Sequence, residues 1–273
     1  MQLAEQLSFW SAVVLYAASF GLFSLTLVLK KTRFAQPAVL ICSTAFTLHT
    51  MSLVVRWIDT GHPPYVTFFE SVSASAWFGM LAYMILRQFR REFSLVGLVV
   101  SGASFILLGW ASTPSYTGEV LPASLRSVWL FIHATFATAG LGLFLVAAGI
   151  SVLWLWREKR NGIISEKFVL PSNEIFDETA FRYILVGFLF WTVMLLSGAI
   201  WANNAWGRYW GWDPIETWSL ICWLVYALYI HLHFTFTKLR GTFTAWYAAF
   251  AVLVAAFSLW GVGYAYKTLH TYG

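Results

Sequence analysis

Eight long apolar stretches, separated by short polar segments, dominate this sequence. A membrane-spanning helix needs about 20 mostly apolar residues, and the stretches that qualify lie at roughly 8–29, 37–57, 66–86, 93–110, 128–156, 180–201, 215–236 and 243–266. Lipid offers no hydrogen bonds to the backbone, which therefore has to satisfy its own polar groups. The pattern predicts an all-α, polytopic membrane helix bundle with about eight transmembrane helices. Since no internal repeat divides the chain, we expect residues 1–273 to form a single transmembrane domain.

The balance of charged and apolar residues excludes an ordinary soluble domain. Of the 273 residues, 59% are hydrophobic and only 11% are charged, whereas a soluble domain carries about 25% charged residues. The formal net charge of +5 would suggest nucleic acid in a soluble protein. Here the charges lie between apolar stretches, so we interpret them as signals of membrane topology and expect no nucleic-acid partner.

The basic residues alternate between the two sides of the predicted bundle. Thirteen lysines and arginines fall on one side, and four fall on the other. The first set consists of Lys30, Lys31, Arg33, Arg87, Arg90, Arg91, Arg157, Lys159, Arg160, Lys167, Arg182, Lys238 and Arg240. The basic side of a membrane protein faces the cytoplasm, so both termini are predicted on the extracytoplasmic side. No lysine or arginine precedes the first apolar stretch, which we therefore expect to remain as a helix rather than to be cleaved as a signal peptide.

The two cysteines, Cys42 and Cys222, stand alone in different apolar stretches. They form no C-x-x-C pair, so the sequence indicates neither thiol redox chemistry nor a zinc site. We expect both to be buried free thiols.

The segment 201–218, between the sixth and seventh stretches, contains five tryptophans. Tryptophans at the membrane interface commonly anchor helix ends, and this role would account for Trp201 and Trp218. It does not account for Gly207 and Gly211, which allow the backbone to turn and to approach a flat partner closely. An aromatic surface interrupted by glycines suits a planar, apolar, polycyclic ligand. On these residues alone, membrane anchoring and ligand binding both remain open.

Two carboxylates at the end of this segment have the spacing of a helix cap. Asp213 occupies the N-cap position, Pro214 the first helical position, and Glu216 lies three residues after the cap. This spacing is that of a capping box and predicts the start of a helix at Pro214. Thr67 and Glu70 have the same spacing before the third span.

The segment Trp206-Gly-Arg-Tyr-Trp-Gly-Trp-Asp-Pro-Ile-Glu-Thr-Trp218 closely resembles the tryptophan-rich "WWD" signature of haem-handling proteins. Within that superfamily the chain is most similar to the CcsA/ResC component of the system II cytochrome c synthase. Further segments match in family order: residues 56–64 with 69–71, residues 125–133, residues 229–231 and residues 269–273. The chain departs from its relatives at Ile215, where they often carry lysine, and at Thr67, where they often carry asparagine.

The resemblance implies a function in cytochrome c assembly. A chain of this kind relays haem b (iron-protoporphyrin IX) to the extracytoplasmic face and presents it for covalent attachment to the C-x-x-C-H segment of an apocytochrome c. The implied partner is a CcsB/ResB-like subunit with a large outer domain, and the two together would form the cytochrome c synthase (haem lyase). The implied location is a bacterial cytoplasmic (inner) membrane or a thylakoid membrane.

Histidines inside apolar stretches are costly in lipid unless they are paired or bind a ligand, and haem iron accepts one imidazole on each axial side. The resemblance implies that His133 and His270 are the axial pair of an outer haem site. It implies that His49 and His231 are the pair of an inner site. The residues implied to contact haem in the outer site are Trp206, Gly207, Arg208, Tyr209, Trp210, Trp212, Asp213, Glu216 and Trp218.

Several alternatives remain open from the sequence. His233 competes with His231 as the inner ligand, and both members of the inner pair could instead bond to neighbouring helices. His62, in a Gly-His-Pro-Pro turn, is expected to have a loop role. Arg56, Arg126 and Arg208 are candidates for pairing with haem propionates, and Arg208 is preferred because it lies within the tryptophan segment.

Two other functions are considered. A quinol-oxidising b-type cytochrome commonly carries two histidines 13 or 14 residues apart on one helix, and no span of this sequence has such a pair. A non-haem transporter or assembly scaffold would use the tryptophans only as an anchor. Transporters often show repeated halves, which are not evident here.

Overall fold

The computed structural model describes residues 2–112, 127–159, 163–165, 168–236 and 240–266. The long helices are α1 (Gln2–Leu29), α2 (Ala35–Thr60), α3 (Phe68–Phe89), α4 (Val96–Ala111), α5 (Val128–Lys159), α6 (Asn173–Trp206), α7 (Pro214–Thr235) and α8 (Thr242–Ala256). A π-helix, η5 (Phe257–Gly261), and a last helical turn, α9 (Val262–Ala265), continue α8. Single 3₁₀ turns, η1 (Thr32–Phe34) and η2 (Arg91–Phe93), and an antiparallel ribbon of β1 (Ile163–Ser165) and β2 (Phe168–Val169) complete the described elements.

The eight predicted spans correspond to the eight long helices, and the predicted all-α class is confirmed. Seven helices are long and apolar enough to cross a membrane, counting α8 through α9 as one. The remaining helix, α4, has only 16 residues, which is about 24 Å at 1.5 Å per residue. The stretch 157–178, expected to be a loop, instead contains the β ribbon and the first turns of α6.

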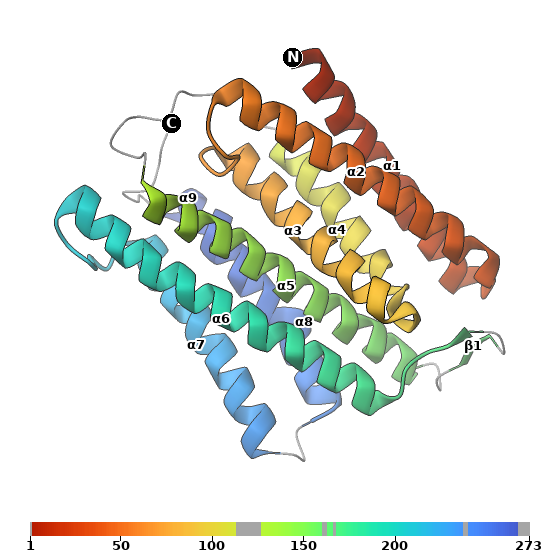
Figure 1. Cartoon of the computed structure of the whole chain (residues 1–273). Helices are drawn as coiled ribbons and strands as arrows, with labels where there is room; N and C mark the ends of the chain where they lie inside the picture. The colour runs from red at the N-terminus through yellow and green to blue at the C-terminus, as the bar shows by residue number, and fades with distance from the viewer. Residues whose placement is uncertain (1, 113–126, 160–162, 166–167, 237–239, 267–273) are drawn as a thin grey trace.

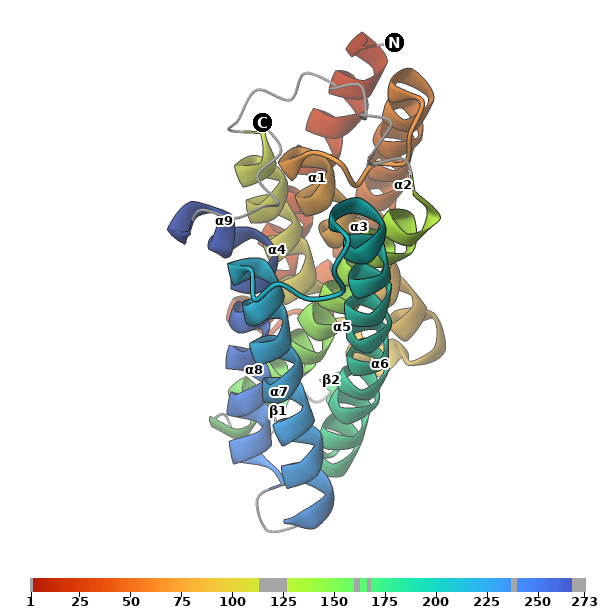
Figure 2. The same ribbon diagram turned by 90° about the vertical axis from the view of Figure 1, so that its left-hand side faces the viewer.

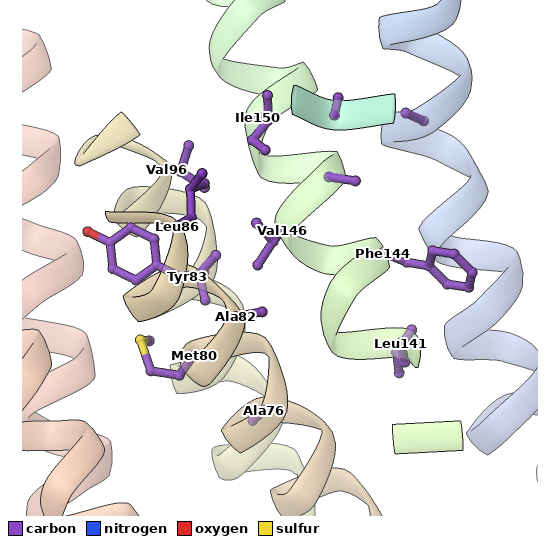
Figure 3. Packing of buried hydrophobic residues seen from close by; sticks show 14 of the residues in the cluster. Ala76, Met80, Ala82, Tyr83, Leu86, Val96, Leu141, Phe144, Val146 and Ile150 are labelled. Carbon is purple, nitrogen blue, oxygen red and sulfur yellow. The ribbon is translucent and has the colours of Figure 1, made fainter. Parts of the chain in front are cut away.

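The fifth span is the central helix of the bundle. The most apolar window of α5 is 78% buried, against 33% or less for the windows of α1, α2, α6, α7 and α8. It packs against α3, α4, α6 and α8, and α6 runs alongside it in Figure 1. Figure 3 shows Val146 on the side of α5 that faces α3, whereas Phe144 points the opposite way. The Phe144 ring stacks on that of Tyr226 of α7, with centroids 3.5 Å apart.

Gly142 allows the backbones of α5 and α3 to approach each other closely. A Cβ atom on Gly142 would lie 2.5 Å from the backbone nitrogen of Gly79. Any side chain at this position would therefore push the two helices apart. Small residues at helix crossings are the usual means by which membrane helices reach close backbone contact.

The alternating helix directions give the bundle two distinct ends. We call the end at which α1, α3 and α5 finish the basic end, because most of the described lysines and arginines lie there. The opposite end, which carries the loop 207–213 between α6 and α7, is called the tryptophan end. The N-terminal turn of α1 and α9 also lie toward this end (Figures 1 and 2).

A buried cluster of charges joins three helices near the tryptophan end. Arg56 of α2 donates from Nη1 to Glu5 of α1 over 3.0 Å and from Nε to Glu70 of α3 over 2.6 Å. The other carboxylate oxygen of Glu70 accepts the backbone N–H of Val66 and of Thr67, which completes the capping box predicted there. Arg56 is thus held by two carboxylates of the bundle itself.

The prediction for the cysteines is confirmed. Both Cys42 and Cys222 are free and buried.

Candidate functional site

His133 of α5 is held by the backbone of α6. Its Nδ1 lies 2.8 Å from the carbonyl oxygen of Met194. A carbonyl oxygen can only accept, so the ring proton is on Nδ1 and the lone pair of the neutral imidazole is on Nε2. The ring reaches this carbonyl because Gly198 has no side chain: a Cβ atom there would lie 2.5 Å from Nδ1.

The structure brings His133 to the tryptophan segment. A cavity of about 40 Å³ has walls formed by His133, Met194, Trp201, Tyr209, Trp210 and Glu216, among others. This volume is close to that of one water molecule. The segment therefore leaves little free space beside the histidine in this conformation.

The segment turns sharply after α6 and exposes part of its aromatic surface. Gly207 ends α6 with φ of +73°, a left-handed conformation that glycine adopts without strain, as its place in the sequence suggested. Trp212 also has a positive φ, +56°, which is rare for a bulky residue. The Tyr209 and Trp212 side chains are 60% and 69% exposed, whereas Trp201 is buried. Trp201 and Trp206 meet edge to face, with ring centroids 4.9 Å apart.

The carboxylates at the end of the segment cap α7, as predicted. Asp213 accepts the backbone N–H of Ile215 over 3.0 Å. The Oε2 atom of Glu216 accepts the N–H groups of Asp213 and Gly211 over 3.1 and 2.7 Å. Glu216 also lines the His133 cavity, so one side chain ties the fold of the loop to the wall of the cavity.

Two polar groups of the segment are available to bind a ligand. The indole nitrogen of Trp210 is buried and has no hydrogen-bond partner among the residues that the structure describes. The Arg208 side chain lies over Gly211, where a Cβ atom would be 2.5 Å from the guanidinium carbon. Arg208 is exposed and forms no ion pair with the described part of the chain.

The structure does not bring the predicted inner pair together. His49 is fully buried, with Nδ1 3.4 Å from the hydroxyl of Tyr16 and Nε2 2.9 Å from that of Ser73. His231 is exposed on α7. The helix that carries His49, α2, packs against α1, α3 and α4, whereas α7 packs against α6 and α8, and the two helices lie on different sides of the bundle in Figure 1.

His233, the alternative to His231, is the buried histidine of α7. It is 5% exposed, and its Nε2 lies 2.9 Å from a carboxylate oxygen of Asp177 on α6. Its ring stacks on Phe181, with centroids 4.0 Å apart.

His62 lies in the loop between α2 and α3. His62 is buried in its turn, with Nδ1 3.0 Å from the carbonyl oxygen of Pro63. Nearby, burial and then the carboxylate of Glu70 raise the pKa of Tyr65, so this phenol is neutral near pH 7. His270 and Arg126 lie outside the described residues.

The sequence of this bundle matches a known family over most of its length. The model of the cytochrome c assembly protein family matches residues 65–270, which include His133 and the whole tryptophan segment. The chain belongs to this family. The membership predicted from the tryptophan segment is thus confirmed, and the chain is an integral membrane protein of cytochrome c assembly.

Relatives within the family cover most of the chain. The cytochrome c biogenesis protein CcsA of Nicotiana tomentosiformis is 32% identical over 253 residues, which cover 81% of this chain and 80% of that protein. CcsA of Chlamydomonas reinhardtii is 34% identical over 235 residues, covering 83% of this chain and 65% of that protein.

A solved structure has the same fold at lower identity. The cytochrome c haem lyase CcmF superposes with a TM-score of 0.75 over 95% of this chain, at 20% identity. The chain spans 46% of CcmF. The helix arrangement described above is therefore also found within a longer chain.

Proposed function

We propose that this chain holds haem at the tryptophan end and presents it for covalent attachment to an apocytochrome c. The observation that supports this most is the bond from His133 Nδ1 to the carbonyl of Met194. Haem iron is ligated by a neutral imidazole nitrogen. A ring whose other nitrogen donates to a carbonyl is fixed in both tautomer and orientation for that task.

The residues around His133 suit haem as the substrate. Trp201, Tyr209 and Trp210 provide flat apolar walls, and the exposed guanidinium of Arg208 is available for a propionate. The cavity of about 40 Å³ is too small for a porphyrin. Binding thus requires the loop 207–213 to move outward, and we place the second axial ligand at His270.

The attachment step needs orientation more than catalytic groups on this chain. Each cysteine thiol of the C-x-x-C-H segment adds across a vinyl group of haem, so that a C–S bond forms and the thiol proton ends on the other vinyl carbon. The chain would hold the ring in place and exclude water while the two chains meet. In this proposal the tryptophan end faces away from the cytoplasm, and a CcsB/ResB-like subunit with a large outer domain completes the synthase.

The haem content of the purified protein tests this proposal. We expect the wild type, made with ample haem, to carry b-type haem in a pyridine haemochrome assay. His133→Gly should lose most of it, and added imidazole should restore it. His62→Ala, which removes a buried histidine outside the cavity, is the matched control. A wild type that stays free of haem would return the tryptophan segment to a membrane-anchor role.

A further inference from the structure

A second, larger cavity opens at the basic end of the bundle. It has a volume of about 710 Å³ and lies where the end of α5, the start of α6, the end of α7 and the start of α8 meet. These four helix ends lie in the lower part of Figure 2. We call this cavity the vestibule. It is separate from the His133 cavity, so a ligand bound in it would be independent of the proposed haem function.

The vestibule is acidic although the surrounding end of the bundle is basic. Four carboxylates line it, against the single guanidinium of Arg240. The carboxylates are those of Glu158, Glu174, Asp177 and Glu178. Asp177 is bonded to His233 and Glu178 to Arg182. Glu158 and Glu174 form no ion pair with any described residue, although the charge of Arg157 acts on Glu174. Among the described residues, the carboxylates at the vestibule therefore outnumber the cations.

A buried acceptor in the wall also lacks a donor. The Nε2–H of His233 donates to the carboxylate of Asp177, which can only accept while it is ionised. In the neutral ring the lone pair is then on Nδ1. This atom is buried and has no hydrogen-bond partner within the described part of the chain. A buried polar atom without a partner is unusual in a folded protein, and a donor bound here would satisfy it.

We propose that the vestibule binds an organic cation, an ammonium or guanidinium group, which donates to Nδ1 of His233 and pairs with Glu158 and Glu174. The rings of Trp154 and Phe181 also line the vestibule. The His233 ring covers one face of Phe181, and the open face of an aromatic ring attracts a cation. A metal ion fits less well, because no group of three or more histidine, cysteine or acidic side chains among the described residues could hold one. The propionates of haem would be repelled by the carboxylates.

In this proposal the cationic group belongs to a lysine or arginine side chain of another polypeptide. Transmembrane helices carry their lysines and arginines at the cytoplasmic flank, which is the predicted position of the basic end. The indole N–H of Trp154 is likewise buried without a partner among the described residues. A peptide brings carbonyl oxygens that this donor can bind, whereas a free polyamine has none.

Binding of two probes to the full chain in nanodiscs of uncharged lipid tests the proposal. The probes are a fluorescent tetralysine amide, followed by anisotropy, and spermidine, followed by competition. Glu158→Gln with Glu174→Gln should weaken tetralysine binding roughly fivefold, since exposed charge pairs contribute little individually. His233→Gln should weaken it further. Glu92→Gln, which removes an acid at the same end outside the vestibule, should leave it unchanged.

Trp154→Phe distinguishes the two sources because it keeps an aromatic face and removes only the N–H donor. It should weaken tetralysine binding and leave spermidine unaffected, with an unchanged thermal unfolding temperature as the check on folding. If this variant binds tetralysine as tightly as the wild type does, the peptide source is overturned. Tetralysine binding that survives the acidic double substitution, or haemin that displaces tetralysine from the wild type, would overturn the cation site itself.

Discussion

The Nδ1 atom of His133 lies 2.8 Å from the carbonyl oxygen of Met194, and this bond couples the central helix α5 to α6 and so to the tryptophan segment. The histidine is on α5, the carbonyl is on α6, and α6 leads directly into the segment. Any shift of α6 against α5 would therefore rotate the imidazole relative to the loop 207–213. Substitutions that disturb this coupling should therefore change how the outer site holds haem.

Gly198→Ala should impair the site without touching the histidine itself. The new Cβ atom would lie 2.5 Å from Nδ1 of His133, so the ring must move and its bond to Met194 is lost. Overpacking of this kind costs about 1–3 kcal/mol. We expect lower haem content and a shifted Soret band in the purified variant. Gly109→Ala is the matched control, since a Cβ atom there meets nothing within 4 Å. An unchanged spectrum for Gly198→Ala would mean that this bond does not orient the ligand.

Glu216 should control how firmly the tryptophan segment closes. Glu216→Ala removes the acceptor of two backbone N–H groups, those of Gly211 and Asp213, and loss of such a cap costs about 1 kcal/mol. We expect haem to leave the variant faster when apomyoglobin is added as the acceptor. Glu216→Gln keeps an oxygen at the capping position and should behave nearly as the wild type. Equal release rates for the alanine variant and the wild type would show that the cap does not restrain the segment.

The sequence predicts those features that depend only on residues close together in one helix. The apolar stretches predicted the helices, and the spacing of Asp213 and Glu216 predicted the cap of α7, because these features depend on residues a few positions apart. The approach of His133 to the segment is consistent with the family resemblance, which assigns both to one outer haem site.

Contacts between helices could not be predicted from the sequence. The depth of His49 in its span could be counted, but its hydrogen bonds to Tyr16 and Ser73 depend on which helices become neighbours. The apolar pattern predicts that this span begins only at residue 180 and so places Asp177, which binds His233, in a loop, whereas α6 begins at Asn173. The π-helix at Phe257–Gly261 has no pattern in the apolar stretch that would reveal an extra residue in the turn.

Arg56 should stabilise the fold rather than bind haem. Arg56→Met would leave the buried carboxylates of Glu5 and Glu70 without their cation, and breaking a buried ion pair costs about 3–5 kcal/mol. We expect a clearly lower thermal unfolding temperature in detergent. Adding Glu70→Gln to Arg56→Met should recover part of this loss, because one uncompensated charge is removed. Arg91→Met, at an exposed arginine, should unfold as the wild type does, and the same unfolding temperature for Arg56→Met would contradict the structural role.

His49 and His231 should behave differently when each is replaced by alanine, although the sequence predicted a common role. His49 makes two hydrogen bonds between helices, each worth about 0.6 kcal/mol in a membrane protein. The cavity left by the ring adds to this loss, so His49→Ala should destabilise the bundle by roughly 2–3 kcal/mol. His231 is exposed, and its replacement should change the stability by less than about 0.5 kcal/mol. Thermal unfolding and haem content, measured on the same samples, separate the two roles.

A loss of haem in His231→Ala at unchanged stability would support ligation by His231, with a partner other than His49 in the conformation described. Full haem content in both variants, once the destabilised one is kept below its unfolding temperature, would leave the inner pair without a function in haem binding.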